Sequence, residues 1–172
     1  MLLFLFAIAQ LITKTHVVQI NYCSCNKDGL TFINQINEER EKHNLTKIPT
    51  SSSLCTVANE HVEQLSTNSS IYEPPCNLHS WEDCCYTEKN PQCMWLKPIE
   101  ITNSDSLGYE IAAEGQKDSA GALRSLMNSP NHREVILNEG EWVQKKWKSI
   151  GAGIEDKFYV AWFSEEEDDV NC

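Results

Sequence analysis

The stretch IGAGIEDKFYVAWF, residues 150–163, decides the fold class of this chain. Residues 150–154 and 158–163 flank the polar segment Glu155-Asp156-Lys157, a pattern that predicts a β-hairpin. Successive side chains of a strand point to opposite faces, and in the second run both faces are apolar. The two faces carry Phe158, Val160 and Trp162 on one side and Tyr159, Ala161 and Phe163 on the other. Because both faces avoid water, we expect the sheet to be covered on both sides.

Helical periodicity precedes this hairpin. Residues 30–43 place apolar side chains on one face and a charged run on the other, which predicts an amphipathic helix. A second helix is expected after the stretch 49–53, where a hydroxyl side chain would cap it. Its apolar stripe is the strongest periodic signal in the chain and consists of Leu54, Val57, Ala58, His61, Val62 and Leu65.

Two more helices are expected between this region and the hairpin. One begins near Asp118 or Ser119, and the next is capped by Ser129 and has Pro130 at its first position. Several helices followed by a sheet that is apolar on both faces predict an α+β sandwich.

Residues 72–98 show neither helical nor strand periodicity. The segment contains several prolines and two of the five tryptophans, Trp81 and Trp95. It also contains the cysteines Cys76, Cys84, Cys85 and Cys93. This composition predicts a long irregular loop that is held by disulfides.

Eight cysteines in 172 residues is a high and even number, which indicates an oxidising compartment. A thiolate zinc site is the competing interpretation. Neither Cys23-Ser24-Cys25 nor Cys84-Cys85 has the two-residue gap that lets two thiolates hold one tetrahedral ion, so disulfides are favoured.

The sequence does not fix which cysteines pair. We expect the four cysteines of the 72–98 loop to pair among themselves, with separate partners for Cys84 and Cys85. We expect Cys172 to tie the C-terminus to Cys23, Cys25 or Cys55.

The first residues of the chain predict secretion. Residues 1–12 are almost entirely apolar but too few to span a bilayer, so residues 1–15 are interpreted as a signal peptide, cleaved between Ala9 and about Ile20. Asn44 and Asn68 begin glycosylation sequons, which agrees with extracellular placement. Residues 23–172 then form a single domain whose acidic tail, residues 165–172, is expected to be solvated.

The formal net charge of -11 limits the partners of the protein. Binding to a phosphate backbone needs clustered Lys and Arg, so a nucleic acid is excluded as a partner. Docking on an anionic membrane surface is excluded for the same reason. We expect a monomer.

Two histidines are candidate site residues. His79 lies in the irregular loop, and His132 lies in the first turn of a helix, where the dipole favours a neutral imidazole. With a carboxylate from Glu110 or Glu114, both imidazoles can hold Zn²⁺ with an open position. The alternative is that both histidines form hydrogen bonds that organise two loops, since no compact ligand motif joins them. His61, on the apolar stripe, is expected to be a core histidine.

Several short segments occur in a characteristic order. They are residues 33–40, 54–62, Leu78-His79-Ser80, 108–112, 129–133, 135–137 and 150–154. This ordered set resembles the CAP superfamily, the SCP-like extracellular proteins, and is most similar to the compact bacterial-type branch. The resemblance covers about Leu30 to Phe163.

The resemblance implies a three-layer α-β-α sandwich with a central antiparallel sheet. It also implies a cleft where two His and two acidic residues converge and bind a divalent metal in some members. On this basis His79 and His132 match the two histidines, and Glu110 or Glu114 is the candidate acid.

The chain departs from the family pattern in three places. The Gly-Glu-Asn-Ile segment reads Gly108-Tyr109-Glu110-Ile111, and a shift by one residue in a strand turns a side chain to the other face, which argues against a complete set of four. The Gly-His-Tyr-Thr-Gln segment is absent, and a Cys- and Trp-rich stretch is added between Cys76 and Cys93.

The leading hypothesis is a secreted binding module that recognises a protein or a small apolar ligand, such as a sterol or lipid, through this cleft and the disulfide loop. Trp81 and Trp95 are candidate recognition residues, although both could equally plug the edge of the core. One alternative is a metal-assisted hydrolase that uses His79, His132 and Glu110 or Glu114. The other is a structural or defensive secreted protein without a cleft ligand.

Overall fold

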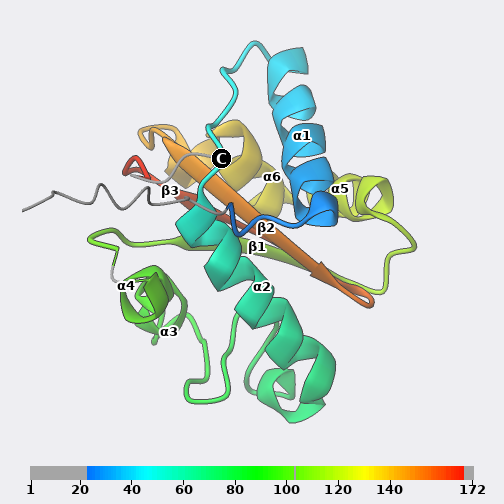
Figure 1. Ribbon diagram of the computed structural model, residues 1–172, viewed down its shortest axis with the longest axis vertical. Coiled ribbons are helices and arrows are strands. Elements are labelled where there is room, and N and C mark those ends of the chain that lie inside the picture. The colour runs from blue at the N-terminus through cyan, green and yellow to red at the C-terminus, as the bar shows by residue number, and fades with distance from the viewer. Residues whose placement is uncertain (1–22, 103, 169–172) are drawn as a thin grey trace, which may run out of the picture.

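The computed structural model describes residues 23–102 and 104–168 of the chain (Figure 1). Its elements are, in order, α1 Lys27–Lys42, α2 Ser52–Thr67, η1 Ser69–Tyr72, α3 Gln92–Trp95, α4 Lys97–Thr102, β1 Tyr109–Glu114, α5 Ser119–Asn128, α6 Pro130–Leu137, η2 Gly140–Trp142, β2 Ser149–Glu155 and β3 Phe158–Ser164. The predicted signal peptide and Cys172 lie outside the described residues. In the part of the chain that is described, no helix combines the length and apolar character that a bilayer span requires.

The three strands form one antiparallel sheet in the order β1-β3-β2. Strands β2 and β3 form the predicted hairpin, with Ala152 opposite Ala161, and Asp156 in its turn has a φ of 51°. Strand β1 pairs with the other edge of β3 and places Ile111 opposite Ala161. All but the last residue of β1 are buried, so this strand lacks the alternation of polar and apolar residues by which a strand is recognised.

Helices cover both faces of the sheet, which confirms the predicted α+β sandwich (Figure 1). On one face, α1, α5 and α6 pack against one set of alternate β3 residues, Tyr159, Ala161 and Phe163. On the other face, α2 and the short α3 pack against Phe158, Val160 and Trp162. The two apolar faces that the sequence of β3 predicts are therefore two separate cores.

The helices begin where local side chains can satisfy their first amides. Asn26 starts α1 a few residues earlier than predicted, since its side chain accepts a hydrogen bond of 2.7 Å from the Gly29 amide. Ser51 caps α2 and Asp118 caps α5 in the same way, as predicted. Ser129 is the N-cap of α6 and Pro130 its first residue, but the Ser129 side chain forms no capping hydrogen bond.

Helix α2 lies directly on strand β2 because that strand has glycines at the contact. A Cβ atom at Gly151 would lie 2.2 Å from the Leu54 carbonyl carbon, and one at Gly153 would lie 2.5 Å from the Ala58 carbonyl oxygen. Both distances are far inside van der Waals contact. The glycines of the IGAGI segment therefore set how closely α2 approaches the sheet.

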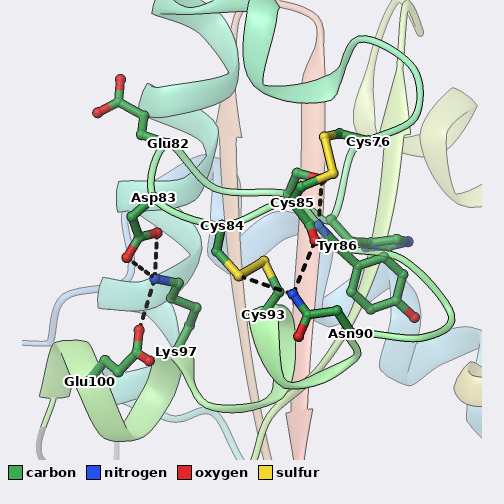
Figure 2. Close-up of a disulfide and its surroundings, with 12 residues drawn as sticks. Cys76, Glu82, Asp83, Cys84, Cys85, Tyr86, Asn90, Cys93, Lys97 and Glu100 are labelled. Atoms are coloured by element: carbon green, nitrogen blue, oxygen red, sulfur yellow. Dashed lines mark hydrogen bonds and ion pairs between the residues drawn. A yellow bond between two sulfur atoms is a disulfide. The ribbon is translucent and has the colours of Figure 1, made fainter.

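The disulfides agree with the predicted pairing of the loop. Cys76 bonds with Cys85 and Cys84 with Cys93, so the neighbouring Cys84 and Cys85 have separate partners (Figure 2). Cys25 bonds with Cys55 and thereby ties the start of the domain to α2. No free cysteine occurs among the described residues.

The 72–98 loop is less irregular than predicted, because it contains α3 and leads into α4. At its centre the Lys97 ammonium lies 2.8 Å from Asp83 Oδ1 and 2.8 Å from Glu100 Oε2 (Figure 2). Burial lowers the pKa of Lys97, but these two carboxylates outweigh it and raise the pKa. The loop is thus a folded unit held by two disulfides and one buried cation.

The prediction that the acidic tail is merely solvated is wrong for Glu165 and Asp168, while Glu166 and Glu167 are exposed as expected. Glu165 forms an ion pair with Lys145 at 2.5 Å. Asp168 accepts hydrogen bonds from the Ser51 hydroxyl and, at 2.8 Å, from the Ser53 amide. A carboxylate is stabilised at this position because the first amides of a helix carry partial positive charge.

The two predicted glycosylation positions differ in their surroundings. Asn44 is exposed just after α1 and has a φ of 60°. Asn68 caps η1, and its side-chain oxygen accepts hydrogen bonds from the amide and the hydroxyl of Ser70. Glycosylation at both positions stays a prediction.

Candidate functional site

The carboxylate of Glu110 is the centre of the candidate site. Its side chain has no exposed surface, and each of its oxygens meets an imidazole. Oε1 lies 2.5 Å from His61 Nδ1, and Oε2 lies 2.8 Å from His79 Nδ1. The charge of this acid is therefore shared between His61 of α2 and His79 of the 72–98 loop.

The sheet register places Glu110 on the α2 face. Glu110 is opposite Trp162 of β3, and Ala112 two residues further along β1 is on the same face. Helix α2 crosses this face and directs His61 toward the strand. The Glu110 amide faces the sulfur of Met94 at 3.1 Å, so α3 covers the free edge of β1 at this point.

His61 is fully buried, and both of its ring nitrogens have partners. Nδ1 faces Glu110, and Nε2 lies 2.9 Å from the carbonyl oxygen of Ser80. Its ring stacks on Trp81, with centroids 4.2 Å apart and planes at 9°. The prediction of a satisfied core histidine is confirmed, but its contact with Glu110, which sequence spacing does not reveal, makes it part of the site.

His79 lies between this buried pair and the surface. Its amide donates a 3.0 Å hydrogen bond to the Asn77 side chain, which fixes the backbone, and its side chain is 18% exposed. The ring of Tyr86 is 5.3 Å away and that of His132 is 6.3 Å away, measured between centroids. Nδ1 is committed to Glu110, so Nε2 is the nitrogen left for other partners.

His132 comes to the same place from α6, more than fifty residues further along the chain. Burial lowers the pKa of His132, the nearby His79 lowers it further, and Glu110 acts in the opposite direction. Burial alone raises the pKa of Glu110, but His61 and His79 outweigh it and hold this pKa below its usual value. At neutral pH the site thus combines an ionised acid with a neutral His132.

Other predicted site residues lie elsewhere. Glu114 is at the far end of β1 and forms an ion pair with Lys157 at 2.5 Å, so only Glu110 joins the histidines. Trp81 is 3% exposed and packs in the core, which supports the plug interpretation over an exposed recognition residue. Trp95 is half-buried and packs against Tyr109 with centroids 5.8 Å apart.

The side chains present do not fit a resident catalytic zinc ion. Such a site usually has three protein ligands and one open position. Here both Glu110 oxygens are in hydrogen bonds with imidazoles, which leaves Nε2 of His79 and the ring of His132 as ligands. Across residues 23–102 and 104–168, no three His, Cys, Asp or Glu side chains are placed to hold one ion together.

Ser80, next to His79, is not placed as a nucleophile. Its residue has no exposed surface, and its hydroxyl oxygen accepts hydrogen bonds from the amides of Asn77 and Tyr86. This hydroxyl closes the turn that carries His79. It organises the loop rather than serving chemistry.

A separate groove lies between α1 and α5, away from the histidines. It has a volume of about 460 Å³. Helix α5 contributes the apolar side chains Ala120, Leu123 and Met127, and the charged lining consists of Glu38, Glu39 and Lys42 from α1 and Arg124 from α5. The side-chain oxygen of Gln35 in this groove is buried and accepts no hydrogen bond from any described residue.

Three solved structures of bacterial proteins share this fold. An extracellular protein containing an SCP domain from Bacillus anthracis is 22% identical, with a TM-score of 0.59 over 81% of this chain and 40% of that one. A cysteine-rich secretory protein from Staphylococcus aureus is 16% identical, with a TM-score of 0.58 over 81% of this chain and 39% of that one. The chain thus spans about 40% of the length of these two proteins.

An outer surface protein from Borrelia burgdorferi matches over most of both lengths. It is 22% identical, with a TM-score of 0.60 over 80% of this chain and 92% of that one. None of the curated protein sequences matches this chain significantly. The sequence model of the CAP family, described as the cysteine-rich secretory protein family, matches residues 33–140. This range includes β1 with Glu110 and the site histidines His61, His79 and His132. The chain therefore belongs to the CAP family of cysteine-rich secretory proteins.

Proposed function

We propose that this protein is a secreted recognition module that contacts its partner at the outward face of His79 and His132, without a catalytic step. Secretion is supported by the oxidised cysteines and by the apolar first residues of the chain. It is supported further by the structural neighbours described as extracellular or outer-surface proteins.

A single observation carries the non-catalytic part of the proposal. Both oxygens of Glu110 are occupied by imidazoles, at 2.5 and 2.8 Å. An acid or base that takes part in turnover must reach a proton on a substrate. Glu110 is buried and reaches only protein groups, so its role is to hold His79 in place.

The outward face consists of three rings. The rings of Tyr86 and His132 lie 5.3 Å and 6.3 Å from the ring of His79, measured between centroids. His79 is held by Glu110 and by the disulfide-bonded 72–98 loop, and His132 is held by α6. Side chains held in this way lose little conformational entropy on binding, which favours a recognition surface.

Nuclear magnetic resonance can test this proposal without a known partner. The imidazole signals of His79 and His132 would be followed while N-acetyl methylamides of Lys, Arg, Asp, Ser, Leu and Trp are added in turn. We expect at least one of these probes to shift both signals at millimolar concentration. The shift should be lost in His79→Ala for the His132 signal and in His132→Ala for the His79 signal.

His43→Ala is the matched control, because His43 is an exposed histidine that pairs with Glu39 far from the site. This variant should leave the response of His79 and His132 unchanged. If none of the six probes shifts either ring, the face is not a recognition surface. Zinc-dependent hydrolysis of an ester probe that is lost in His79→Ala would instead favour the hydrolase.

The α1–α5 groove favours a second candidate function, the binding of a small apolar ligand. The buried Gln35 oxygen lacks a donor among the described residues, so a ligand with a hydroxyl group on an apolar body would satisfy it. The volume of about 460 Å³ is in the range of small-molecule sites. The charged side chains of the lining are balanced, with Glu38 and Glu39 matched in number by Lys42 and Arg124.

Radiolabelled cholesterol and palmitate distinguish these chemistries. We expect cholesterol to bind more tightly than palmitate, because the sterol hydroxyl can donate a hydrogen bond to the Gln35 oxygen, whereas a carboxylate only accepts hydrogen bonds. Ala120→Trp should fill the groove and abolish binding. Ser125→Trp is the control on the same helix, since Ser125 is exposed and does not line the groove. Equal binding to both variants would exclude the groove as the ligand site.

A further inference from the structure

Two short segments of the 72–98 loop bring His79 and Tyr86 to the outward face. His79 lies in residues 76–80, and Tyr86 lies in residues 84–86. The hydroxyl oxygen of Ser80 joins the segments, because it accepts a hydrogen bond from an amide of each, at 3.2 and 3.0 Å. The rings of His79 and Tyr86 lie 5.3 Å apart at this junction, measured between centroids.

The disulfide between Cys76 and Cys85 lies directly beside these hydrogen bonds (Figure 2). Cys76 precedes Asn77 and Cys85 precedes Tyr86, and the amides of Asn77 and Tyr86 are the two donors to Ser80. The covalent bond therefore fixes the distance between two segments that hydrogen bonds alone would hold less tightly.

Access to the sulfur atoms differs among the three disulfides that join described residues. Cys76 and Cys85 are both half-buried, so each end of their bond lies partly at the surface. By contrast, Cys25 and Cys55 are 8% and 0% exposed, and Cys93 is 4% exposed. Of these three bonds, the Cys76–Cys85 bond is the one that a solute can approach from either end.

Thiol–disulfide exchange favours the same bond. A thiolate attacks one sulfur, and the other sulfur leaves as a thiolate. Attack on Cys84 would release a thiolate at the buried Cys93, where a charge is poorly solvated. The side-chain amide of Asn90 also lies 3.7 Å from the Cys84 sulfur and covers it (Figure 2). In the Cys76–Cys85 bond, the leaving thiolate is released toward water.

We propose that the Cys76–Cys85 disulfide positions His79 beside Tyr86 and is a redox switch of the outward face, an inference that rests on the proposed recognition function. The reductant is a dithiol. One of its thiolates attacks Cys76 or Cys85, the protein S–S bond breaks and a mixed disulfide forms, and its second thiol then releases the protein sulfur. The protein gains two electrons and two protons as two thiols, and the dithiol becomes a disulfide.

Reduction loosens one segment more than the other. Residues 84–86 stay in place, because Trp81 and Cys84 exchange backbone hydrogen bonds of 2.8 and 3.1 Å. Residues 76–80 lose their covalent tie to them. The His79 ring then takes up more positions relative to the other rings, so its immobilisation on binding costs more conformational entropy. We expect the affinity of the outward face to fall by about two- to tenfold.

Partial reduction with dithiothreitol tests which bond opens first. The folded protein would be treated with increasing concentrations of dithiothreitol, trapped with iodoacetamide, and analysed by peptide mass to locate the alkylated cysteines. We expect Cys76 and Cys85 to be alkylated before the cysteines of the other two described disulfides. Earlier or simultaneous alkylation of Cys84 and Cys93 would overturn the proposal.

Nuclear Overhauser signals between aromatic rings test the positioning role without a partner. In Cys76→Ala/Cys85→Ala, we expect the signals between the His79 and Tyr86 rings to be lost. The wild type in which this bond alone has been reduced and alkylated gives the same readout should the double variant not fold. Ring signals that persist without the bond would overturn the proposal.

Two controls accompany this measurement. The Phe32 and Tyr159 rings are 6.1 Å apart in the core, measured between centroids, and their signals should remain without the bond. Cys84→Ala/Cys93→Ala is the matched variant, since its bond also joins cysteines nine residues apart in the same loop. It should keep the ring signals of the outward face. Their loss in this variant too would overturn a specific role for the Cys76–Cys85 bond.

The amide probes of the proposed function separate this inference from that function. A probe that binds the oxidised wild type should bind Cys76→Ala/Cys85→Ala about two- to tenfold more weakly. Unchanged affinity would overturn the switch. If no probe binds the wild type, the recognition function fails, whereas the order of reduction and the ring signals still decide whether this bond positions His79.

Discussion

His61 and Trp81 lie face to face, with ring centroids 4.2 Å apart and planes only 9° from parallel. This contact joins α2 to the 72–98 loop. The Lys97 ammonium lies 5.1 Å from the centroid of the same indole ring, so the loop places a cation and an imidazole around one tryptophan. The Trp81 side chain anchors the 72–98 loop to the core.

Truncation of Trp81 should therefore destabilise the protein. Trp81 is 3% exposed, and Trp81→Ala leaves a cavity, so we expect the free energy of unfolding to fall by about 3–5 kcal/mol. Trp81→Phe should cost less, because the indole nitrogen finds no acceptor among the described residues. Urea denaturation with the disulfides intact measures both. Ile99→Ala at an exposed position is the control and should change little.

Alanine at Gly151 should separate α2 from the sheet. Its Cβ would lie 2.3 Å from the Cys55 amide nitrogen, and backbone cannot move aside as a side chain can. We expect Gly151→Ala to lower the thermal midpoint markedly or prevent folding. Gly121→Ala in α5 is the matched control: its nearest atom is at 3.3 Å, and alanine favours a helix. An equal effect of both substitutions would contradict the close-packing argument.

Asp168 is expected to stabilise the first turn of α2. Its carboxylate accepts hydrogen bonds from the Ser53 amide at 2.8 Å and from the Ser53 hydroxyl at 3.1 Å. By analogy with the loss of a helix cap, Asp168→Ala should cost about 0.5–2 kcal/mol of unfolding free energy in urea denaturation. Glu167→Ala, one residue away, serves for comparison. No difference between the two variants would show that the tail contact contributes nothing.

The stability of the fold should decrease in acid through Glu110. In the folded protein the pKa of Glu110 is lowered from 4.5, so the unfolded chain binds its proton first as the pH falls. The contribution of the ionised carboxylate is present above about pH 4.5 and is lost as the pH falls through the folded pKa. The urea concentration at the midpoint of unfolding would be measured at pH 7, 5, 4 and 3. As the pH is lowered, this midpoint should fall less for Glu110→Gln than for the wild type. Parallel curves would be inconsistent with an ionised Glu110.

Zinc binding should be weak and independent of the site histidines. Two outward imidazoles supply two of the four positions of a tetrahedral ion, one short of the usual catalytic set. Isothermal titration with Zn²⁺ should therefore give the same result for the wild type and for His79→Ala/His132→Ala. A micromolar site that disappears in the double variant would restore the metal-assisted hydrolase as the better hypothesis.

Local patterns were sufficient for much of the fold. The two-sided apolar pattern of residues 158–163 predicted a sheet buried between layers, and the structure has such a sheet. The stripe from Leu54 to Leu65 predicted α2, and the clustering of four cysteines predicted two disulfides within one loop. Strand β1 was harder to recognise because nearly all of its residues are buried, so no polar alternation marks it.

The sequence by itself determined where helices and the hairpin form and that His79, His132 and Glu110 are candidates for one site, because periodicity, capping residues and segment order are properties of neighbouring residues. Only the tertiary structure decided that Glu110 joins His79 while Glu114 does not, and that His61 shares the same carboxylate. The physical reason is the sheet register. Glu110 and Glu114 lie four residues apart on the same face of β1, and the register places Glu110 opposite Trp162 and Glu114 at the hairpin end opposite Phe158, which does not follow from the residues of β1 alone.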